Sequence, residues 1–388
     1  MAGQRVYIRG CGVVSAVGSR QQAMADACRR GQAKPSATML LHSCDHPLPF
    51  YAISGETDVI SSLHLYRHID RAVDSALHDA ALTPQEIAQL PLFVGSTACD
   101  ISALEVHYQQ ALHHNIHAVP LYRSGFGVLA GYVIDRLKSS GQEFTFNTAC
   151  SSSANALLMA TRMIEHGRID TALVLGVETR NQMSLQGFSA MMLLSPHGSR
   201  PFDNSRNGTV LGEGVGAIIL SRHPPTASEY AAYPPYYCVG GANLTDSINV
   251  TSSSAAMVAA VIQQTLDAAN PAPRHIDVIK AHGTSTPAND SAEAQGIRQL
   301  FGGSPPPVTS LKPYIGHTLG ACGVMEAILL LACVKENFIP ATPGFTTLDA
   351  TCGIRPLTQA IPLVGGNILL NYFGFGGNNT SLIFSNHP

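Results

Sequence analysis

Short runs of β-branched and aliphatic residues alternate along this chain with longer segments of helical periodicity. Several of the short runs are apolar throughout, as strands covered on both faces require. In the first half, the strand pattern occurs at residues 5–8, 92–94, 144–147, 171–177 and 217–221. This alternation predicts a layered α/β architecture.

The pattern starts again after a Pro-rich stretch without apolar periodicity, residues 223–237, which is the best candidate for a linker. Strands are then predicted at residues 238–241, 278–281, 308–310, 368–371 and 381–384, with helices near residues 255–269 and 320–335. We therefore predict two similar halves, residues 1–225 and residues 236–388. The similarity is inferred from the order of the elements, because the sequence shows no residue-level repeat.

Composition narrows the class of protein. Hydrophobic residues make up 45% of the chain and charged residues 13%, which is typical of a chain with many fully buried segments. The net charge is −3 and there is no run of Lys or Arg, so no nucleic-acid or anionic membrane surface is indicated. The longest apolar stretch falls far below the roughly 18 residues that a membrane span requires.

Nine cysteines are scattered without a C-x-x-C pair or a zinc-like spacing, so we expect neither a disulfide framework nor a metal site. The first residues lack the basic and apolar regions of a secretory signal. Together these features favour a reducing, cytoplasmic location.

One cysteine lies in a chemically informative context. The segment Phe144-Thr-Phe-Asn-Thr-Ala-Cys150-Ser-Ser-Ser predicts a strand, a tight turn and a helix that ends near Gly167. At a helix N-terminus, unpaired N–H groups and the helix dipole favour a thiolate, so Cys150 is a candidate nucleophile with a lowered pKa. A buried structural cysteine is the commoner alternative for any single Cys, and only context argues against it here.

Two histidine segments supply that context. His282 and His317 each end or follow a predicted strand and are flanked by glycine. Small neighbours leave an imidazole free to project into a cleft. Most of the 16 histidines must have other roles, so these two are candidates only jointly with Cys150.

A glycine-rich turn, Gly374-Phe375-Gly376-Gly377, joins the last two predicted strands. Its backbone amides could stabilise the oxyanion of a thioester reaction. Taken alone, the segment favours an ordinary hairpin turn.

A dinucleotide-binding loop is not supported. Gly212-Glu-Gly-Val-Gly-Ala217 fits G-x-G-x-x-A, but it leads into a predicted strand and not into the helix that a nicotinamide or flavin site needs.

In this order the motifs resemble the β-ketoacyl-acyl carrier protein synthases of the thiolase superfamily, in particular the elongating type II ketosynthases. The resemblance covers essentially the whole chain. It is carried by Asn147-Thr-Ala-Cys150-Ser-Ser-Ser, Arg200-Pro-Phe-Asp203, residues 208–216, His282-Gly-Thr-Ser-Thr-Pro287, Asp290, Glu293, Lys312 with His317, and Gly374-Phe-Gly-Gly377.

The resemblance implies a thiolase-like five-layered α-β-α-β-α fold of two similar halves. Cys150 would take the acyl chain, and His282 and His317 would hold the malonyl thioester carbonyl during decarboxylation. Lys312 would support the site through a network with Asp290 and Glu293.

The resemblance also implies the surroundings of the substrate. The amides of Cys150 and Phe375 would hold the acyl carbonyl, and Phe375, with Gly374 and Gly376, would gate the acyl pocket. Thr284 and Thr286 would face the pantetheine arm. Phe188, Met191, Met192 and residues 97–104 are expected to line or approach the acyl pocket.

No cofactor is implied beyond the phosphopantetheine of the acyl carrier protein, which is the expected partner. The enzyme would be a homodimer, or a heterodimer with a ketosynthase-like chain-length-factor subunit. Fatty acid elongation and polyketide or polyene synthesis, the aryl polyene type included, both remain open.

Two other functions compete. A thiolase needs a second reactive Cys near the C-terminus, where this chain has Phe375, and an initiating synthase has a Cys-His-Asn set in place of Cys-His-His. A non-catalytic partner subunit typically lacks the nucleophile, whereas Cys150 and both histidines are present.

Overall fold

The computed structural model describes residues 5–41, 46–53, 62–114, 125–225, 234–248, 250–251, 253–269 and 275–387. Ten strands form one large sheet, and each overlaps one of the ten predicted strands. They are β1 (Val6–Ser15), β4 (Leu92–Gly95), β5 (Glu143–Phe146), β6 (Thr171–Glu178), β7 (Gly214–Ser221), β8 (Tyr237–Thr245), β9 (Val278–Lys280), β10 (Val308–Thr309), β13 (Asn367–Gly374) and β14 (Asn378–Ser385).

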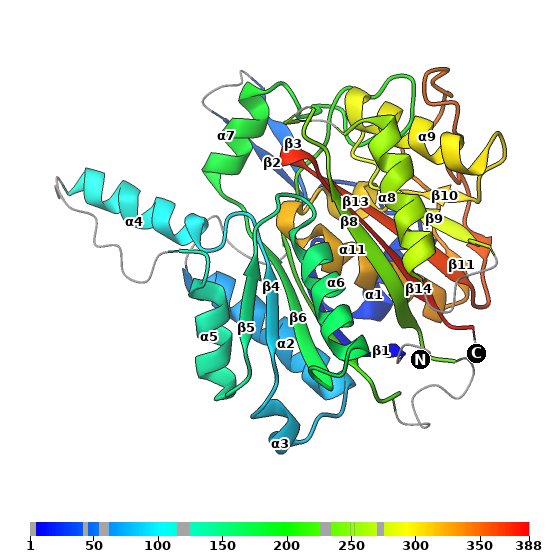
Figure 1. Cartoon of the computed structure of the whole chain (residues 1–388). Coiled ribbons are helices and arrows are strands. Elements are labelled where there is room, and N and C mark those ends of the chain that lie inside the picture. Colours follow the sequence, from blue (N-terminus) through cyan, green and yellow to red (C-terminus); the bar gives the residue numbers. More distant parts are fainter. Residues whose placement is uncertain are drawn as a thin grey trace.

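The sheet consists of two halves with the same topology (Figure 1). The first half has the order β5-β4-β6-β7-β1, and the second has the order β10-β9-β13-β14-β8. In each half the first three strands are parallel and the other two pair antiparallel. The halves are joined where β1 pairs with β8, with Val6 opposite Cys238 and Tyr7 opposite Tyr237. The two similar halves inferred from element order are thus present in the fold.

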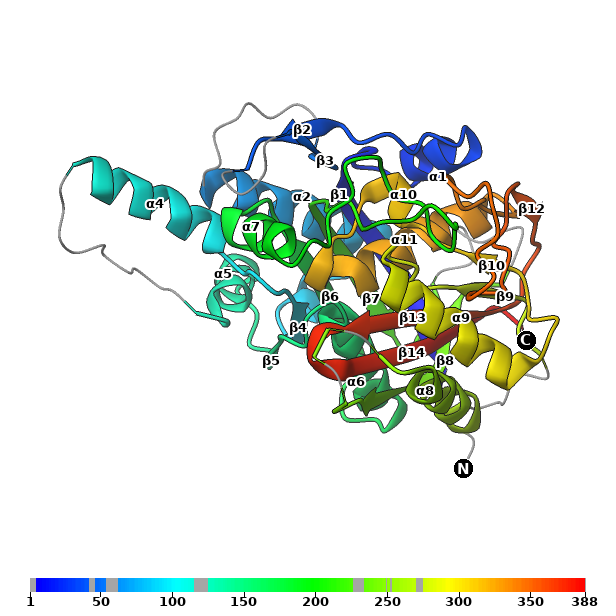
Figure 2. The same cartoon turned by 90° about the horizontal axis from the view of Figure 1, so that it is seen from above.

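Helices cover the sheet halves in three layers (Figure 2). They are α1 (Gln21–Arg29), α2 (Ser62–Asp79), α3 (Pro84–Ile87), α4 (Ile101–His113), α5 (Val128–Leu137), α6 (Ser152–Glu165), α7 (Gln182–Ala190), α8 (Ala255–Ala268), α9 (Pro287–Phe301), α10 (Lys312–Ile315) and α11 (Cys322–Lys335). The single turns η1 (Leu319–Ala321) and η2 (Phe375–Gly377) are 3₁₀ helices.

The buried core confirms the five layers. Helices α2 and α5 pack on the outer face of the first half-sheet, and α8 and α9 pack on the outer face of the second. Between the half-sheets lie α6 and α11, and their apolar residues belong to the largest buried cluster, together with residues of the strands on either side. Apart from its termini α11 is almost entirely apolar and buried, as a helix between two sheets must be.

Several elements had no predicted range. They are the two-stranded sheets of β2 (Ala37–Met39) with β3 (Leu48–Phe50) and of β11 (Phe338–Ile339) with β12 (Ile361–Pro362), and the helices α1 to α5, α7, α9 and α10. The segment around Gly212 leads into β7, which confirms that it is not a dinucleotide-binding loop. Most of the predicted linker, residues 226–233, lies outside the described residues, so the domain boundaries stay a prediction.

Helix α4 extends away from the body of the molecule in both views (Figures 1 and 2). None of the described helices is both long and apolar enough to span a bilayer. Within the same residues no group of three or more His, Cys, Asp or Glu side chains is arranged to hold a metal ion.

Candidate active site

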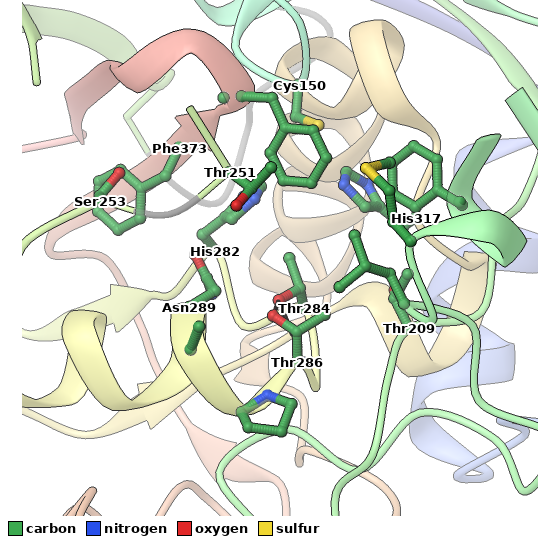
Figure 3. Close-up of a pocket in the computed structure, with 17 residues that line it drawn as sticks. Cys150, Thr209, Thr251, Ser253, His282, Thr284, Thr286, Asn289, His317 and Phe373 are labelled. Atoms are coloured by element: carbon green, nitrogen blue, oxygen red, sulfur yellow. Dashed lines mark hydrogen bonds between the residues drawn. The ribbon is translucent and has the colours of Figure 1, made fainter. Parts of the chain in front are cut away.

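A cavity of about 530 Å³ lies where loops from both halves meet, and it brings most of the predicted site residues together (Figure 3). Its lining residues are Cys150, Phe188, Met191, Leu193, Thr209, Thr251, Ser253, His282, Thr284, Thr286, Pro287, Ala288, Asn289, His317, Phe373, Gly374 and Phe375. Neither Met192 nor residues 97–104 belong to this set. Lys312, Asp290 and Glu293 are fully buried behind the cavity wall.

Cys150 lies in the tight turn between β5 and α6. Ala149, just before it, has a left-handed backbone with φ of 52°, an uncommon conformation for a residue with a Cβ. The start of α6 packs closely on its neighbours, because a Cβ at Gly323 would lie 2.1 Å from the amide nitrogen of Ala154 and one at Gly95 would lie 2.3 Å from Ser153. Glycine at these two positions therefore allows the turn to fit between β4 and α11.

The protonation state of the Cys150 thiol differs from the expectation. Burial raises its pKa to about 12, although the charge of Lys312 and hydrogen bonds from the amides of Phe375 and Cys150 lower it. The prediction of an ionised thiol is therefore wrong for the free protein, because loss of water outweighs the favourable groups nearby. The thiol is protonated at neutral pH and must lose its proton as the sulfur attacks.

A polar network joins the Cys150 turn to the glycine-rich turn of the other half. The side-chain oxygen of Asn378 accepts hydrogen bonds from Ser151 at 2.8 Å, Asn155 at 2.7 Å and Asn243 at 2.7 Å. Ser151 and Asn155 belong to the start of α6, whereas Asn243 lies on β8 and Asn378 begins β14. The hydrogen bonds of Asn378 therefore fix the position of the nucleophile relative to the Phe375 amide.

We expect Asn378→Ala to slow acylation of Cys150 and condensation by similar factors, because both steps depend on the relative position of Cys150 and the Phe375 amide. Removing the shared acceptor also takes one hydrogen-bond partner away from three buried donors, which lowers the free energy of unfolding by about 1–3 kcal/mol. Mass spectrometry of the acylated protein and denaturant unfolding measure the two effects. Asn378→Asp is the matched control, since a carboxylate oxygen accepts from the same three donors, and equal losses in both variants would contradict this role.

The rings of His282 and His317 lie next to each other in the cavity (Figure 3), edge to face, with centroids 5.5 Å apart and planes at 85°. Burial, together with the positive charges of Lys312 and Lys280, lowers the pKa of both imidazoles well below the usual value. Both rings are therefore neutral at pH 7, as a donor to a carbonyl oxygen should be.

The hydrogen bonds of the two rings bear on where their protons lie. The Lys312 ammonium, which has only donors, lies 3.3 Å from Nδ1 of His282, so that nitrogen accepts and the proton is on Nε2. Nδ1 of His317 lies 3.0 Å from Sγ of Cys322. Burial raises the pKa of the Cys322 thiol, so it stays protonated and can donate to Nδ1. Both rings can then present an Nε2–H group to a substrate oxygen.

The partners of Lys312 correct the predicted network. Its Nζ donates to the carbonyl oxygen of His282 at 2.6 Å and to Oε1 of Glu326 at 2.7 Å. Neither Asp290 nor Glu293 is hydrogen-bonded to it, because both carboxylates instead accept from backbone amides. Glu293 accepts from the amides of His282 and Gly283, and Asp290 accepts from those of Phe202 and Ser285.

We expect Lys312→Ala to lower condensation on the order of 10²-fold and to lower acylation of Cys150 much less. The variant removes the groups that orient His282, whereas the turn that carries Cys150 keeps its own hydrogen bonds. Single-turnover measurement of acyl transfer and of carrier-bound product separates the two steps. Equal loss in both half-reactions would contradict the assigned role.

The remaining predicted residues fall in two places. Phe188 stacks on Phe375, with ring centroids 5.6 Å apart and an interplanar angle of 11°, so the two rings form one aromatic wall of the cavity. The hydroxyls of Thr284 and Thr286 lie 2.9 Å apart on another part of the lining. Gly376, with φ of 79°, shapes the turn but does not line the cavity.

Sequence reasoning missed Glu326, Lys280 and Asn378. A usable signal existed for the first two, because each is a charged residue inside an otherwise apolar segment that was predicted to be buried. Lys and Glu are almost never fully buried unless they are paired. No comparable signal marked Asn378, whose role depends on contacts between distant segments.

Most of the chain matches the two domains of one known protein family. Residues 50–225 match the family described as "Beta-ketoacyl synthase, N-terminal domain", and residues 238–346 match "Beta-ketoacyl synthase, C-terminal domain". The chain is 27% identical over 412 residues to the 3-oxoacyl-[acyl-carrier-protein] synthase 2 of Coxiella burnetii, with 99% of each chain covered.

Two solved structures are also similar. The ishigamide ketosynthase/chain length factor has a TM-score of 0.88 and 25% identity, with 100% of each chain covered. A ketosynthase (ApeO) in complex with its chain length factor (ApeC) from Xenorhabdus doucetiae has a TM-score of 0.80 and 27% identity, with 99% of this chain and 98% of that chain covered.

Proposed function

Because this chain belongs to the β-ketoacyl synthase family, we propose that it condenses malonyl-acyl carrier protein with an acyl chain held on Cys150, with loss of CO₂. The observation that carries this proposal is that Cys150, His282 and His317 line one cavity. The product is a β-ketoacyl-acyl carrier protein, and the enzyme is an acyltransferase that forms carbon–carbon bonds.

Acyl transfer is the first half-reaction. The sulfur of Cys150 attacks the thioester carbonyl of an acyl-carrier protein, a carbon–sulfur bond forms, and the pantetheine sulfur leaves with the proton that the thiol gives up. The amides of Phe375 and Cys150 already hydrogen-bond toward the sulfur. Amides in this position can also donate to the developing oxyanion, which is worth on the order of 10²–10³ in rate per donor.

Condensation is the second half-reaction. The Nε2–H groups of His282 and His317 would donate to the thioester carbonyl of the malonyl group while its terminal carbon–carbon bond breaks and CO₂ leaves. The enolate then attacks the acyl carbonyl, the bond to Cys150 breaks, and the sulfur takes up a proton. Neutral imidazoles suit this step, because the carbonyl oxygen gains negative charge.

The substrate is held by the rest of the cavity. We assign the pantetheine arm to the hydroxyls of Thr284 and Thr286, and the acyl chain to the wall formed by Phe188, Met191 and Phe375. No cofactor beyond the phosphopantetheine of the carrier protein is required for this chemistry. We place the reaction in the cytoplasm, because the eight cysteines of the described residues are all free thiols.

A second ketosynthase-like chain is the proposed partner beside the carrier protein. Strand β5 is an edge of the large sheet and is partly exposed, and within the described residues no strand pairs with its outer edge. The protruding α4 exposes Tyr108 and Leu112, and Phe126 is exposed after it. Of the two similar solved structures, one is a ketosynthase/chain length factor and the other is a ketosynthase in complex with its chain length factor, which supports a heterodimer beside the homodimer.

The product spectrum tests the function and its pathway. Carrier-bound products from a panel of acyl primers, analysed by mass spectrometry with and without a candidate partner chain, should contain two carbons more than the primer after each round. Extension of saturated primers alone would indicate fatty acid elongation. Extension of unsaturated or keto primers, only when the partner is present, would indicate polyketide or polyene synthesis. Absence of any extended product under all conditions would contradict the proposal.

A further inference from the structure

Lys280 is a buried cation that the reaction as described above does not use. It lies on β9, two residues before His282, and is fully buried. Its Nζ donates to Oε2 of Glu326 at 2.5 Å and to the carbonyl oxygen of Asn371 at 2.7 Å, and lies 3.6 Å from the ring centroid of Tyr372. These contacts fix the ammonium group on one side of the Glu326 carboxylate.

Glu326 is shared between two lysines. Oε2 accepts from Lys280, and Oε1 accepts from Lys312, whose Nζ is also bonded to the carbonyl oxygen of His282 and lies 3.3 Å from its Nδ1. A continuous chain of contacts therefore runs from Lys280 through Glu326 and Lys312 to the imidazole. Two cations on one carboxylate also leave a surplus positive charge beneath the two histidines.

We propose that Lys280 is a positioning residue of the condensation step, which acts through Glu326 and Lys312 on His282. The inference rests on the proposed function. With Lys280 in place, Glu326 offers Lys312 a single oxygen, and the Lys312 ammonium keeps its remaining donors for His282. Without it, both carboxylate oxygens are open to Lys312, which draws the ammonium away from the imidazole.

The charge of Lys280 has a second effect, which gives the proposal its pH signature. The groups around its ammonium are Glu326 on α11, Lys312 on α10, Glu293 on α9 and Tyr372 on β13. Burial and then the Lys312 charge lower the pKa of Lys280 to about 8, although Glu326 opposes this shift. The Lys280 cation is therefore present below pH 8 and is lost above it. While present, it helps to lower the pKa of His282 and His317, after burial and the Lys312 charge.

The arrangement is not explained by stability. A buried ion pair balances its charges, whereas this trio carries one uncompensated cation, and an uncompensated buried charge is costly. Lys280→Met would leave Glu326 paired with Lys312 alone. The thermal midpoint of that variant is therefore expected to be unchanged or higher, which a purely structural role would not produce.

The experiment compares wild type with Lys280→Met, Lys280→Gln and the exposed control Lys138→Met. Acylation of Cys150 is followed by intact mass, decarboxylation by CO₂ release from malonyl-carrier protein between pH 5 and 9.5, and folding by thermal unfolding. Lys280→Met should slow CO₂ release by about tenfold or more and acylation much less. Lys280→Gln keeps donors for Glu326 and Asn371, so it should recover much of the rate at neutral pH.

The pH profiles separate positioning from charge. As the pH is lowered, both Lys280 variants should lose activity before wild type does. The reason is that the pKa of the imidazoles is higher without the nearby cation. The decline of wild type near pH 8 should be absent from Lys280→Met. Lys138→Met should match wild type throughout.

The inference is overturned if Lys280→Met releases CO₂ as fast as wild type, if both half-reactions fall by the same factor, or if the thermal midpoint falls together with activity. Failure of wild type itself to release CO₂ would instead contradict the proposed function, and with it this inference.

Discussion

Replacing Cys150 with alanine is expected to abolish acyl transfer, so that incubation with acyl-carrier protein leaves no acyl adduct on the protein. The variant lacks the sulfur that forms the covalent intermediate, and among the described residues no other cysteine lines the cavity. Condensation should fall by at least about 10³-fold. Intact mass spectrometry after incubation with a mass-tagged acyl-carrier protein measures the adduct directly.

Cys333→Ala provides the matched control for this experiment. Cys333 is also a buried free thiol, but it lies in the apolar core formed by α11 and does not line the cavity. Cys333→Ala should lower the free energy of unfolding as a small core truncation does, and it should still form the adduct. An acyl adduct on Cys150→Ala, or its absence from Cys333→Ala protein that is folded, would contradict the assignment of the nucleophile.

Replacing either His282 or His317 with alanine is expected to lower CO₂ release from malonyl-carrier protein on the order of 10²–10³-fold while Cys150 is still acylated. Each variant removes one of two N–H donors to the same carbonyl oxygen, and this oxygen gains charge only when the malonyl carbon–carbon bond breaks. Acylation does not use that pair of donors. Radiolabelled CO₂ release and acyl-adduct mass, measured on the same protein, separate the two effects.

Acylation serves as the internal control for folding of these histidine variants, and the double variant supplies a further test. If the two imidazoles act as a unit, replacing both should cost little more than replacing one. Asparagine at either position retains an N–H donor and should keep more activity than alanine. Loss of acylation equal to the loss of CO₂ release in both alanine variants would show that the residues support the fold and not the reaction.

The buried carboxyl groups near His282 differ in pKa, because their neighbours differ. The Glu326 carboxylate lies between two lysines, which lower its pKa against the effect of burial. Glu293, bonded to the amides of His282 and Gly283, has a pKa raised to about 7 by burial. The site thus holds cations close to uncharged imidazoles, an arrangement that favours negative charge on a bound substrate oxygen.

The sequence alone determined the strands of the large sheet and pointed to the candidate reacting groups. All ten strands of the large sheet were predicted, because strands buried on both faces must be continuously apolar and such runs are visible without a fold. Cys150, His282, His317 and the Phe375 turn were also identified, since each belongs to a local motif in which a few adjacent residues set the backbone. These features depend on short-range information, and the sequence contains it in full.

Only the tertiary structure decided how those groups are charged and held. The helix start at Cys150 suggested an ionised thiol, yet the closure of the site around it removes water and raises the pKa to about 12. The partner of Lys312 is Glu326 and not the expected Asp290 or Glu293, because α11 passes between the two half-sheets and brings its one interior carboxylate to the lysine. Burial and long-range pairing are properties of the packed chain, so no local pattern of residues could have supplied them.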